Sequence, residues 1–411
     1  MHSDGCRFCG MVLKHIFLDL GMSPLANSYL KADQLNQMEQ FYPLRAFVCE
    51  RCLLVQLQEF ESPDHIFSDY AYFSSYSDMF LQHAKDYVDM AVERFSLGTE
   101  SYVVEIASND GYLLQNFVKR GIRVLGIEPA KNVAEVAVKK GIPSCVKFFG
   151  MHTAQELVAE ERHPDLIIGN NVLAHVPDLN DFVGGLKVLL GRGGIITIEF
   201  PHLMRLMAMN QFDTIYHEHF SYFSLTTVSQ VFAKHGLTIF DVEEVSTHGG
   251  SLRIYARHTD DHANPVTERL MVLSEKEKVQ GFAALDHYLS FSEKVRETKR
   301  ALLEFLIRAK REGKSVVAYG AAAKASTLLN YCGVRCDFVD YLVDRSPYKK
   351  GHWLPGVHIP IHDPEHVKET KPDYVLILAW NLKDEIIKQM SCIRSWGGQF
   401  IVPIPEVKIC P

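Results

Sequence analysis

Two Cys-x-x-Cys pairs near the start of the chain limit its possible folds more than any other feature. In each pair, one tight turn directs two thiolates at a tetrahedral ion, so two pairs predict a four-thiolate zinc site. Four sulfurs leave no coordination position open, and we therefore expect a structural rather than a catalytic zinc. The alternative, four buried cysteines without metal, fits this spacing poorly. The expected zinc ligands are Cys6, Cys9, Cys49 and Cys52.

Between the pairs, segments 16–21 and 41–48 have the apolar pattern of short strands. Their apolar content is too small for a core of its own, so we expect the zinc to stabilise this N-terminal domain. Zinc ribbons bind nucleic acid or protein in other settings. Here a net charge of −7 and the lack of a basic run argue against nucleic acid as a partner.

Length and composition indicate a soluble chain of several domains. A chain of 411 residues is too long for one core, and 47% hydrophobic with 23% charged residues is ordinary for globular protein. The first residues do not resemble a signal peptide, and no run of 18 apolar residues occurs, so we expect a cytoplasmic protein without a membrane partner. The five cysteines outside the pairs are scattered, which favours reduced thiols over disulfides.

A strand, a turn of small residues, a helix and a second strand follow one another in the middle of the chain. The apolar run 101–107 ends in the turn 108–111, residues 112–120 have helical spacing, and strand 123–127 ends in Glu128. This order is typical of a doubly wound α/β sheet that binds an adenosine at its carboxyl edge, with the acid on the ribose hydroxyls. The alternative is an α/β sheet without a ligand.

The turn indicates which adenosine cofactor binds. A dinucleotide needs several glycines so that its pyrophosphate can approach, whereas this turn has one glycine and an aspartate. The acid would repel a pyrophosphate but suits the ammonium of a methionine tail, so we expect S-adenosylmethionine. Its expected contacts are Glu105, Ala107, Asn109, Asp110, Gly111, Glu128, Asn170 and Asn171.

The α/β pattern continues after this unit. We expect strands at 165–169 and 194–199, with a helix between them that ends at Leu190, and a helix at 226–235. Strands at 237–245 and 251–258 would close the sheet with an antiparallel edge. Residues 170–175 then follow the carboxyl end of a strand, where such sheets bind ligands.

Residues 214–224 contain an unusual density of proton-transfer groups, with two imidazoles, a carboxylate and two phenols in one short run. Such side chains abstract protons and stabilise oxyanions near neutral pH. A polar loop rich in aromatic residues is the alternative. This run follows the strand after the one that leads to His175, so we expect His175 and His219 to face one pocket.

Together, several motifs resemble the sugar C-methyltransferases of deoxysugar pathways, which act on nucleotide-linked 4-keto-6-deoxyhexoses. The similarity covers essentially the whole chain. The motifs are the paired Cys-x-x-Cys with Pro24-Leu25-Ala26-Asn27 between them, VEIASNDGYLL, NNVLAHVPD, YHEHFSYFS, HGGSLR and GAAAKASTLLNYCG. The resemblance implies an α/β protein with a small N-terminal zinc-binding domain (1–68), a central class I methyltransferase domain (69–270) and a C-terminal Rossmann-like domain (271–411).

The C-terminal third fits this expectation. An amphipathic helix at 293–312 precedes a strand at 315–320 and a helix at 321–329 that begins on small residues. Backbone amides at such a helix start, with Lys324 beside them, suit a phosphate. The GxGxxG pattern is absent, so a dinucleotide is not expected. Further strands at 338–343 and 374–379 complete the unit, which either grips the sugar nucleotide or roofs the cleft.

The resemblance implies a reaction and its residues. A 4-keto group acidifies the hydrogen on C3, and a base there produces an enolate that attacks the sulfonium methyl. His219 is the expected base and Glu218 its orienting partner, with Glu218 as the base left open. Tyr216, Tyr70 and His175 are expected to hydrogen-bond the enolate oxygen. Expected substrate contacts are Tyr222, His248 and Lys324.

Three classes of function remain open from the sequence. They are the C-methyltransferase, a methyltransferase acting on oxygen or nitrogen of another small molecule, and a non-catalytic module that binds zinc and a ligand. The proton-transfer groups favour carbon methylation, because a hydroxyl acceptor needs only one base. The nucleotide (thymidine or guanosine diphosphate), C3 or C5 as the methylated carbon, and the oligomeric state remain open too.

Overall fold

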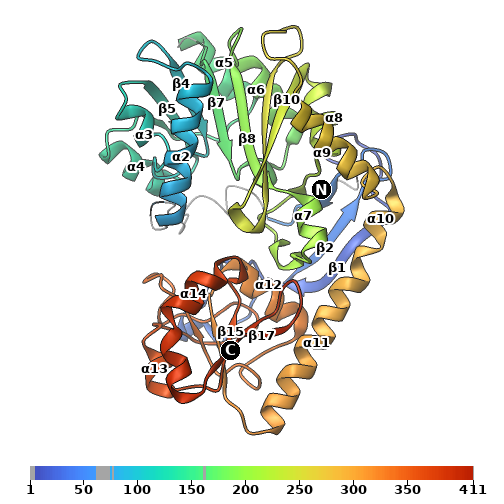
Figure 1. Cartoon of the computed structure of the whole chain (residues 1–411), viewed down its shortest axis with the longest axis vertical. Helices are drawn as coiled ribbons and strands as arrows, with labels where there is room; N and C mark the ends of the chain where they lie inside the picture. Colours follow the sequence, from blue (N-terminus) through green and yellow to red (C-terminus); the bar gives the residue numbers. More distant parts are fainter. Residues whose placement is uncertain (1–4, 62–74, 76–77, 161–162, 411) are drawn as a thin grey trace.

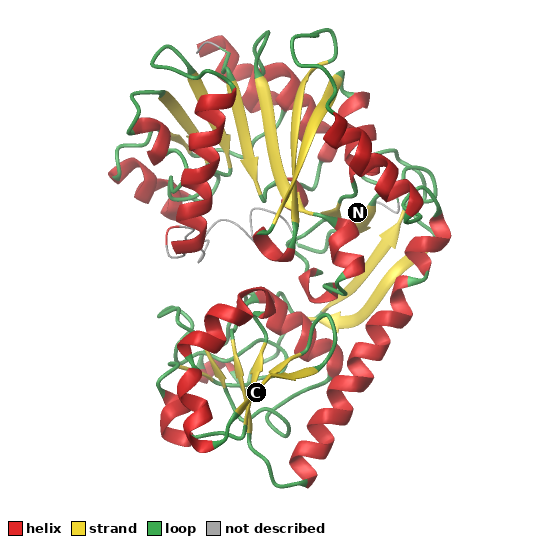
Figure 2. Cartoon of the chain, viewed as in Figure 1, coloured by secondary structure: helices red, strands yellow, loops and turns green. Residues whose placement is uncertain are grey.

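The structure, a computed structural model, contains three β-sheets that follow one another along the chain (Figures 1 and 2). It describes residues 5–61, 75, 78–160 and 163–410. The central sheet and its helices form one lobe, and the C-terminal sheet forms a second. Figure 1 shows strands β1 and β2 near the junction of the two lobes and the long helix α11 running from there along the side of the C-terminal lobe.

The N-terminal sheet has the strand order β1-β2-β3-β9, and all its pairs are antiparallel. The strands are β1 (His15–Ser23), β2 (Tyr42–Val48), β3 (Val55–Leu57) and β9 (Ser221–Tyr222). The predicted strands at 16–21 and 41–48 are confirmed as β1 and β2. The fourth strand comes from the run of proton-transfer groups, since Val55 pairs with Tyr222 and Gln56 with Ser221.

The central sheet has the order β10-β11-β8-β7-β4-β5-β6. Its strands are β4 (Tyr102–Ile106), β5 (Arg123–Ile127), β6 (Ser144–Cys145), β7 (Leu166–Asn170), β8 (Ile195–Pro201), β10 (Leu237–Val245) and β11 (Ser251–His258). Strands β4 to β8 are parallel, and β10 and β11 form the predicted antiparallel edge. All the predicted strands of this region are therefore confirmed.

Helices cover both faces of the central sheet (Figure 2). Val103 of β4 packs in one core with α2 (Asp78–Arg94) and α3 (Gln115–Val118), whereas its neighbour Val104 belongs to the core that holds α5 (Met151–Glu160) and α6 (Leu179–Leu189). Successive strand residues point to opposite faces, so a strand that is apolar throughout fits a sheet covered on both sides. Further helices are α4 (Lys131–Lys139), α7 (Leu203–Ala208), α8 (Leu225–Lys234) and α9 (Glu268–Val279).

The helix predicted at 112–120 is shorter than expected. Only Gln115–Val118 forms α3, because the preceding residues make tight turns in which Asn116 N bonds to Leu113 O and Phe117 N to Leu114 O. The Asn116 amide also bonds back to the carbonyls of Tyr112 and Leu113, which is how asparagine competes with helical hydrogen bonding.

The C-terminal sheet has the order β14-β13-β12-β15-β16-β17 and is parallel except for β17. Its strands are β12 (Val316–Tyr319), β13 (Leu342–Val343), β14 (Ile361–His362), β15 (Tyr374–Ile377), β16 (Gln399–Val402) and β17 (Lys408–Cys410). Its helices are α12 (Ala323–Cys332), α13 (His366–Thr370) and α14 (Lys383–Gln389). The strand predicted at 338–343 is reduced to β13, because residues 338 and 339 bond to Arg335 in a turn.

Two of the helices that connect the central sheet to the C-terminal sheet also pack on the N-terminal one. They are α10 (Leu285–Leu289) and α11 (Phe291–Arg311), the second close to the prediction of 293–312. Phe17 of β1 stacks on Phe291 with ring centroids 5.2 Å apart and meets Tyr288 edge-on at 6.4 Å. The N-terminal sheet therefore contacts the connecting helices as well as the central run that supplies β9. The predicted α/β class, with a four-cysteine cluster in front of two α/β units, is confirmed.

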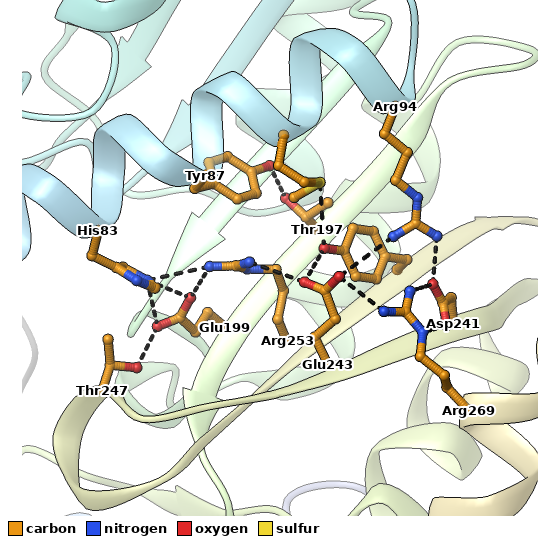
Figure 3. A network of polar contacts seen from close by, with 12 residues as sticks. His83, Tyr87, Arg94, Thr197, Glu199, Asp241, Glu243, Thr247, Arg253 and Arg269 are labelled. Carbon is orange, nitrogen blue, oxygen red and sulfur yellow. Dashed lines mark hydrogen bonds and ion pairs between the residues drawn. The ribbon is translucent and has the colours of Figure 1, made fainter.

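A buried polar network joins α2 to the antiparallel edge of the central sheet (Figure 3). Arg253 donates to Glu199 over 2.7 Å and to Glu243 over 3.1 Å, and Glu199 also bonds to His83 and Thr247. Although burial raises the pKa of Glu199, the bonds from His83 and Arg253 hold it at about 2. The network fixes the start of α2 beside the carboxyl ends of the strands. In the described part of the chain, no helix is long and apolar enough to cross a bilayer.

Candidate active site

A cavity of about 850 Å³ lies at the carboxyl edge of the central sheet. Its walls come from all three parts of the chain: the turns after β4, β5 and β7, the run 216–219, the N-terminal loop 25–29, and the C-terminal segments 322–324 and 379–382. Met79 and Phe80, in the first turn of α2, close it from another side. Ligands of doubly wound sheets bind at this edge.

The turn after β4 holds an unusual backbone. Ala107 has φ +55°, Asn109 φ +50° and Gly111 φ +76°. Left-handed φ at residues other than glycine costs free energy and concentrates at functional sites. A Cβ on Gly111 would lie 2.3 Å from Ile142, so only glycine fits there. Of the expected cofactor contacts, those that line the cavity are Ala107, Asn109, Glu128, Asn170 and Asn171.

Glu128 reaches the cavity from the end of β5. Its two carboxylate oxygens accept hydrogen bonds from the backbone amides of Asn109 (3.0 Å) and Ala130 (2.9 Å). Burial raises the pKa of Glu128, while these two amides lower it. Each carboxylate oxygen has a further lone pair, so the residue can also accept hydrogen bonds from ribose hydroxyls.

The other expected cofactor residues, Glu105, Asp110 and Gly111, lie behind the cavity wall. Asp110 pairs with Lys140, whose Nζ lies 2.9 Å from its carboxylate. Glu105 is 1% exposed, and neither of its oxygens has a hydrogen-bond partner among the described residues. Burial, followed by the charges of Glu128 and Asp110, raises the pKa of Glu105 well above its usual value. Glu105 therefore stays protonated in this state, and a cationic group on the cavity side of the turn, such as the ammonium of S-adenosylmethionine, would favour its ionised form.

His219 is oriented by a hydrogen bond at each ring nitrogen. Nδ1 lies 3.0 Å from the carbonyl oxygen of Thr214, and Nε2 lies 3.0 Å from the hydroxyl of Tyr216. A carbonyl can only accept, so in the neutral ring Nδ1 carries the proton and Nε2 has the lone pair that accepts from the Tyr216 hydroxyl. Tyr216 and His219 both line the cavity, with ring centroids 4.1 Å apart. The arrangement presents a basic nitrogen and a hydroxyl donor together.

His175 and Glu218 line the same cavity. The rings of His175 and His219 meet edge-on at 4.7 Å, so the structure brings these two histidines together as expected. Burial lowers the pKa of His175 to about 4, so its ring is neutral, although a hydrogen bond to the backbone of Glu218 raises the pKa. Burial raises the pKa of Glu218 to about 7, and a hydrogen bond from Asn27 lowers it.

Of three other expected residues, one lies outside the cavity lining and the other two cannot be placed among the described side chains. Tyr222 lies in β9 with its ring 6.1 Å from that of His219, and it is buried outside the cavity lining. His248 lies in a short 3-10 helix (Thr247–Gly249), and its side chain lies outside the described part of the structure. Tyr70 also lies outside the described residues.

Lys324, at the start of α12, lines the cavity from the C-terminal side. Its Nζ donates to Asn381 over 2.9 Å and lies 4.4 Å from the centre of the Trp380 ring. Burial lowers the pKa of Lys324 to about 8, opposed by the carboxylate of Asp213. The indole of Trp380 in turn donates to Asp213 over 2.7 Å. A buried ammonium here suits an anionic ligand.

Several residues of the cavity were not foreseen from the sequence. Asn27, Tyr29 and Lys349 line it, and Asp213 supports it from behind. A signal existed for Asn27, which ends the Pro24-Leu25-Ala26-Asn27 motif. Nothing in the local sequence distinguishes Lys349 from the many surface lysines, because its position depends on packing between domains.

The four cysteines lie together as predicted. Their sulfur atoms are all within 4.8 Å of one another, with Cys6 and Cys52 at 3.5 Å and Cys9 and Cys49 at 3.5 Å. The amide of Gln56 donates to the Cys6 sulfur over 3.2 Å, which is a typical outer contact of a metal thiolate. This donor set fits a tetrahedral zinc. None of the four cysteines lines the cavity, so such a zinc supplies stability rather than chemistry.

Comparisons with known proteins agree with this arrangement. Family models match residues 6–67 (zinc binding domain), 80–242 (methyltransferase domain) and 246–405 (C-methyltransferase C-terminal domain). The chain is 36% identical to C-methyltransferase NovU of Streptomyces niveus over 408 residues, which cover 99% of this chain and 96% of that protein.

Two of the solved structures similar to this chain each cover about half of it. PH0226 of Pyrococcus horikoshii OT3 has 15% identity and a TM-score of 0.38 over 48% of this chain and 99% of that one. The magnesium protoporphyrin IX methyltransferase of Synechocystis PCC 6803, solved with bound SAM, has 16% identity and a TM-score of 0.33 over 47% of this chain and 88% of that one.

Proposed function

The chain belongs to the family of S-adenosylmethionine-dependent C-methyltransferases, and from this premise we propose that it methylates C3 of a nucleotide-linked 4-keto-6-deoxy sugar. One observation carries the proposal. The cavity presents the lone pair of His219 Nε2 next to the hydroxyl of Tyr216, and the His219 side chain is buried. A base beside a hydroxyl donor is what removal of a proton next to a ketone requires.

His219 and Tyr216 have different roles in enolate formation. His219 accepts the C3 proton at Nε2, because Nδ1 already carries a proton that it donates to Thr214. Tyr216 then donates to the 4-keto oxygen instead of to His219, and its hydrogen bond strengthens as charge develops on that oxygen. S-adenosylmethionine supplies the electrophilic methyl group, which the carbon nucleophile takes as the thioether leaves.

Glu218 and His175 have supporting roles in this proposal. Glu218, with a pKa of about 7, can hold negative charge beside the imidazolium that forms on His219, and it is the alternative base. Neutral His175 has a single N–H, which bonds to the backbone of Glu218. We therefore favour Tyr216 over His175 as the donor to the enolate oxygen.

The C-terminal part of the cavity supports a nucleotide-linked substrate. Lys324 and Lys349 both line it, and the backbone amides at the start of α12 lie beside Lys324. Two cations and a helix start suit a diphosphate. We therefore propose that the C-terminal domain grips the thymidine or guanosine diphosphate of the sugar. We also propose domain boundaries near residues 68 and 270 and a cytoplasmic location, where nucleotide sugars are available.

The test uses the pure protein with [¹³C-methyl]S-adenosylmethionine and a panel of thymidine and guanosine diphosphate 4-keto-6-deoxy sugars. We expect one substrate class to gain a methyl carbon that is bonded to C3, seen as a carbon–carbon coupling in a substrate labelled at C3. The corresponding 4-hydroxy sugars are matched controls and should not react, because they cannot form an enolate. A methyl group on C5 would contradict the proposed position, and turnover of the 4-hydroxy sugars would contradict the mechanism.

A further inference from the structure

We propose that Asn27, in the zinc-binding part of the chain, is a positioning residue for the active-site carboxylate of Glu218. This inference rests on the proposed function, because it assumes that Glu218 acts as an ionised group in catalysis. Neither the family matches nor the chemistry of the central sheet assigns a role to the loop that carries Asn27. The proposal makes the N-terminal domain part of the catalytic machinery without contact between zinc and substrate.

The contact itself is direct. Nδ2 of Asn27 donates to Oε1 of Glu218 over 2.6 Å, and both residues line the cavity. Glu218 is only 5% exposed, so few water molecules can replace that donor. A hydrogen bond to an ionised carboxylate is stronger than one between neutral groups, and it holds the carboxylate in a single orientation.

The loop that presents Asn27 is anchored on its far side to the C-terminal domain. The hydroxyl of Tyr29 donates to the carbonyl of Ala321 over 2.6 Å, just before α12. Leu30 and Trp353 exchange two backbone hydrogen bonds of 3.0 and 2.9 Å. The contacts of Tyr29 and Leu30 therefore fix the chain only two and three residues after Asn27, as a positioning group requires.

Glu218 is anchored to the N-terminal domain as well, through its neighbours in the chain. On one side, Nε2 of His217 lies 3.3 Å from the carbonyl oxygen of Pro43. On the other side, the carbonyl of Phe220 accepts a hydrogen bond from the Leu57 amide, and β9 pairs with β3. The backbone that carries Glu218 is thus attached to the N-terminal domain, which also carries Asn27.

The other titratable groups around Glu218 do not replace this donor. His175 is neutral and its ring bonds to the backbone of Glu218 rather than to the carboxylate. Desolvation, followed by the charges of Asp344 and Glu218, raises the pKa of Tyr29, so that phenol stays neutral. His217 and His219, its chain neighbours, bond to the carbonyls of Pro43 and Thr214. Asn27, rather than any of these groups, therefore donates the hydrogen bond that holds the carboxylate.

The experiment replaces Asn27 and follows the ionisation of Glu218 directly. Asn27→Leu removes the donor at nearly constant volume, and Asn27→Asp replaces it with a like charge. Asn36→Leu is the matched control, because Asn36 is an exposed residue of the same domain. The side-chain carboxyl carbon of Glu218 is followed by ¹³C NMR in protein labelled with ¹³C-glutamate, with its signal assigned by its loss in Glu218→Gln. Zinc content and S-adenosylmethionine affinity are measured alongside.

We expect the titration midpoint of Glu218 to rise by about one pH unit in Asn27→Leu and by more in Asn27→Asp, with no change in Asn36→Leu. The acidic limb of the kcat profile should move to higher pH by the same amount, while zinc content and cofactor affinity stay near wild type. An unchanged midpoint in both Asn27 variants would overturn the inference. If the wild type methylates no 4-keto sugar, the proposed function fails, but the titration still decides whether Asn27 controls Glu218.

Discussion

The hydroxyl of Tyr216 lies 3.0 Å from Nε2 of His219, so in the absence of substrate the phenol donates to the lone pair that would accept a proton. The two residues are three apart in the chain and both face the cavity. A ketone oxygen that enters here competes for the same hydroxyl. Once Tyr216 turns to the ketone, Nε2 becomes available, so binding of the correct substrate would itself activate the base.

This relationship predicts different effects for the two residues. His219→Asn should lower kcat by roughly 10²–10⁴ with near-normal affinity for S-adenosylmethionine, because a positioned base contributes about this much. The variant should also lose exchange of the C3 hydrogen with heavy water, measured by NMR with S-adenosylhomocysteine bound. Tyr216→Phe should slow both processes without moving the pH at which activity rises. If the His219→Asn variant exchanged the C3 hydrogen at the wild-type rate, Glu218 would be the base instead.

Glu128 should control cofactor affinity. Glu128→Ala should weaken binding of S-adenosylmethionine by on the order of 1–3 kcal/mol, because charge-assisted hydrogen bonds to the ribose are lost. The same carboxylate bonds to the amides of Asn109 and Ala130, so Glu128→Gln, which keeps one acceptor oxygen, should lose less. Calorimetry measures both affinities. If the wild type and both variants bound S-adenosylmethionine equally well, Glu128 would not be a cofactor contact.

The four-cysteine site should hold one zinc per chain and act on stability. Cys49→Ser should abolish stoichiometric zinc in elemental analysis and lower the melting temperature by on the order of 10 °C, since a structural zinc stabilises a small domain by several kcal/mol. Cys336→Ser, at an exposed cysteine outside the cluster, is the control and should keep the metal. Loss of turnover in a metal-free protein that remains fully folded would show that the zinc is catalytic.

Lys324 should give substrate binding a pH dependence. Burial holds the pKa of this ammonium at about 8, below its usual value, so it is charged below pH 8 and loses its charge above it. The affinity for a nucleoside diphosphate should therefore be greatest below pH 8 and fall by about tenfold as the lysine deprotonates. In Lys324→Met the affinity should be low throughout and should no longer change between pH 7 and 9. A pH-independent affinity in the wild type would argue against a diphosphate at this position.

The polar network beside α2 predicts that replacing two of its arginines lowers the unfolding free energy by different amounts. The side chain of Arg253 is 6% exposed and bridges Glu199 and Glu243, whereas that of Arg269 is 53% exposed. Arg253→Met leaves two acids without their buried cation and should cost about 3–5 kcal/mol of unfolding free energy. Arg269→Met should cost about 1 kcal/mol or less, because water screens the exposed guanidinium and Arg94 still pairs with Asp241. Denaturant titration of both variants measures the difference, and equal losses would contradict it.

The elements of the central sheet were predictable because each carries a periodic pattern. Strands β10 and β11 match the predicted bounds, and the antiparallel edge follows from two strands joined by a short connection. The helix at 112–120 was predicted too long, since asparagine hydrogen bonds and 3-10 turns override the apolar spacing. A strand of two residues such as β9 has no pattern at all, and its pairing depends on a distant partner.

In the candidate site, residues at the ends of periodic elements were predictable, and residues that arrive from other domains were not. His175, Glu128 and Asn170 were predictable because they stand at the carboxyl ends of predicted strands, where ligands meet the sheet. Asn27 and Lys349 reach the cavity from other domains, and no local pattern reports how domains pack. The carboxylate of Asp110, expected near the cofactor, pairs with Lys140, from which it is separated in the chain by α3, β5 and α4.

The pairing of β9 with β3 has a consequence for how the protein is made. All four zinc ligands leave the ribosome early, but the last strand of their sheet, Ser221–Tyr222, is synthesised only after most of the central domain. Until then β3 has an open edge, which invites association with other chains. The zinc-bearing segment is therefore translated before the central sheet but completed only after most of that sheet, and it could not be exchanged between relatives as an independent module.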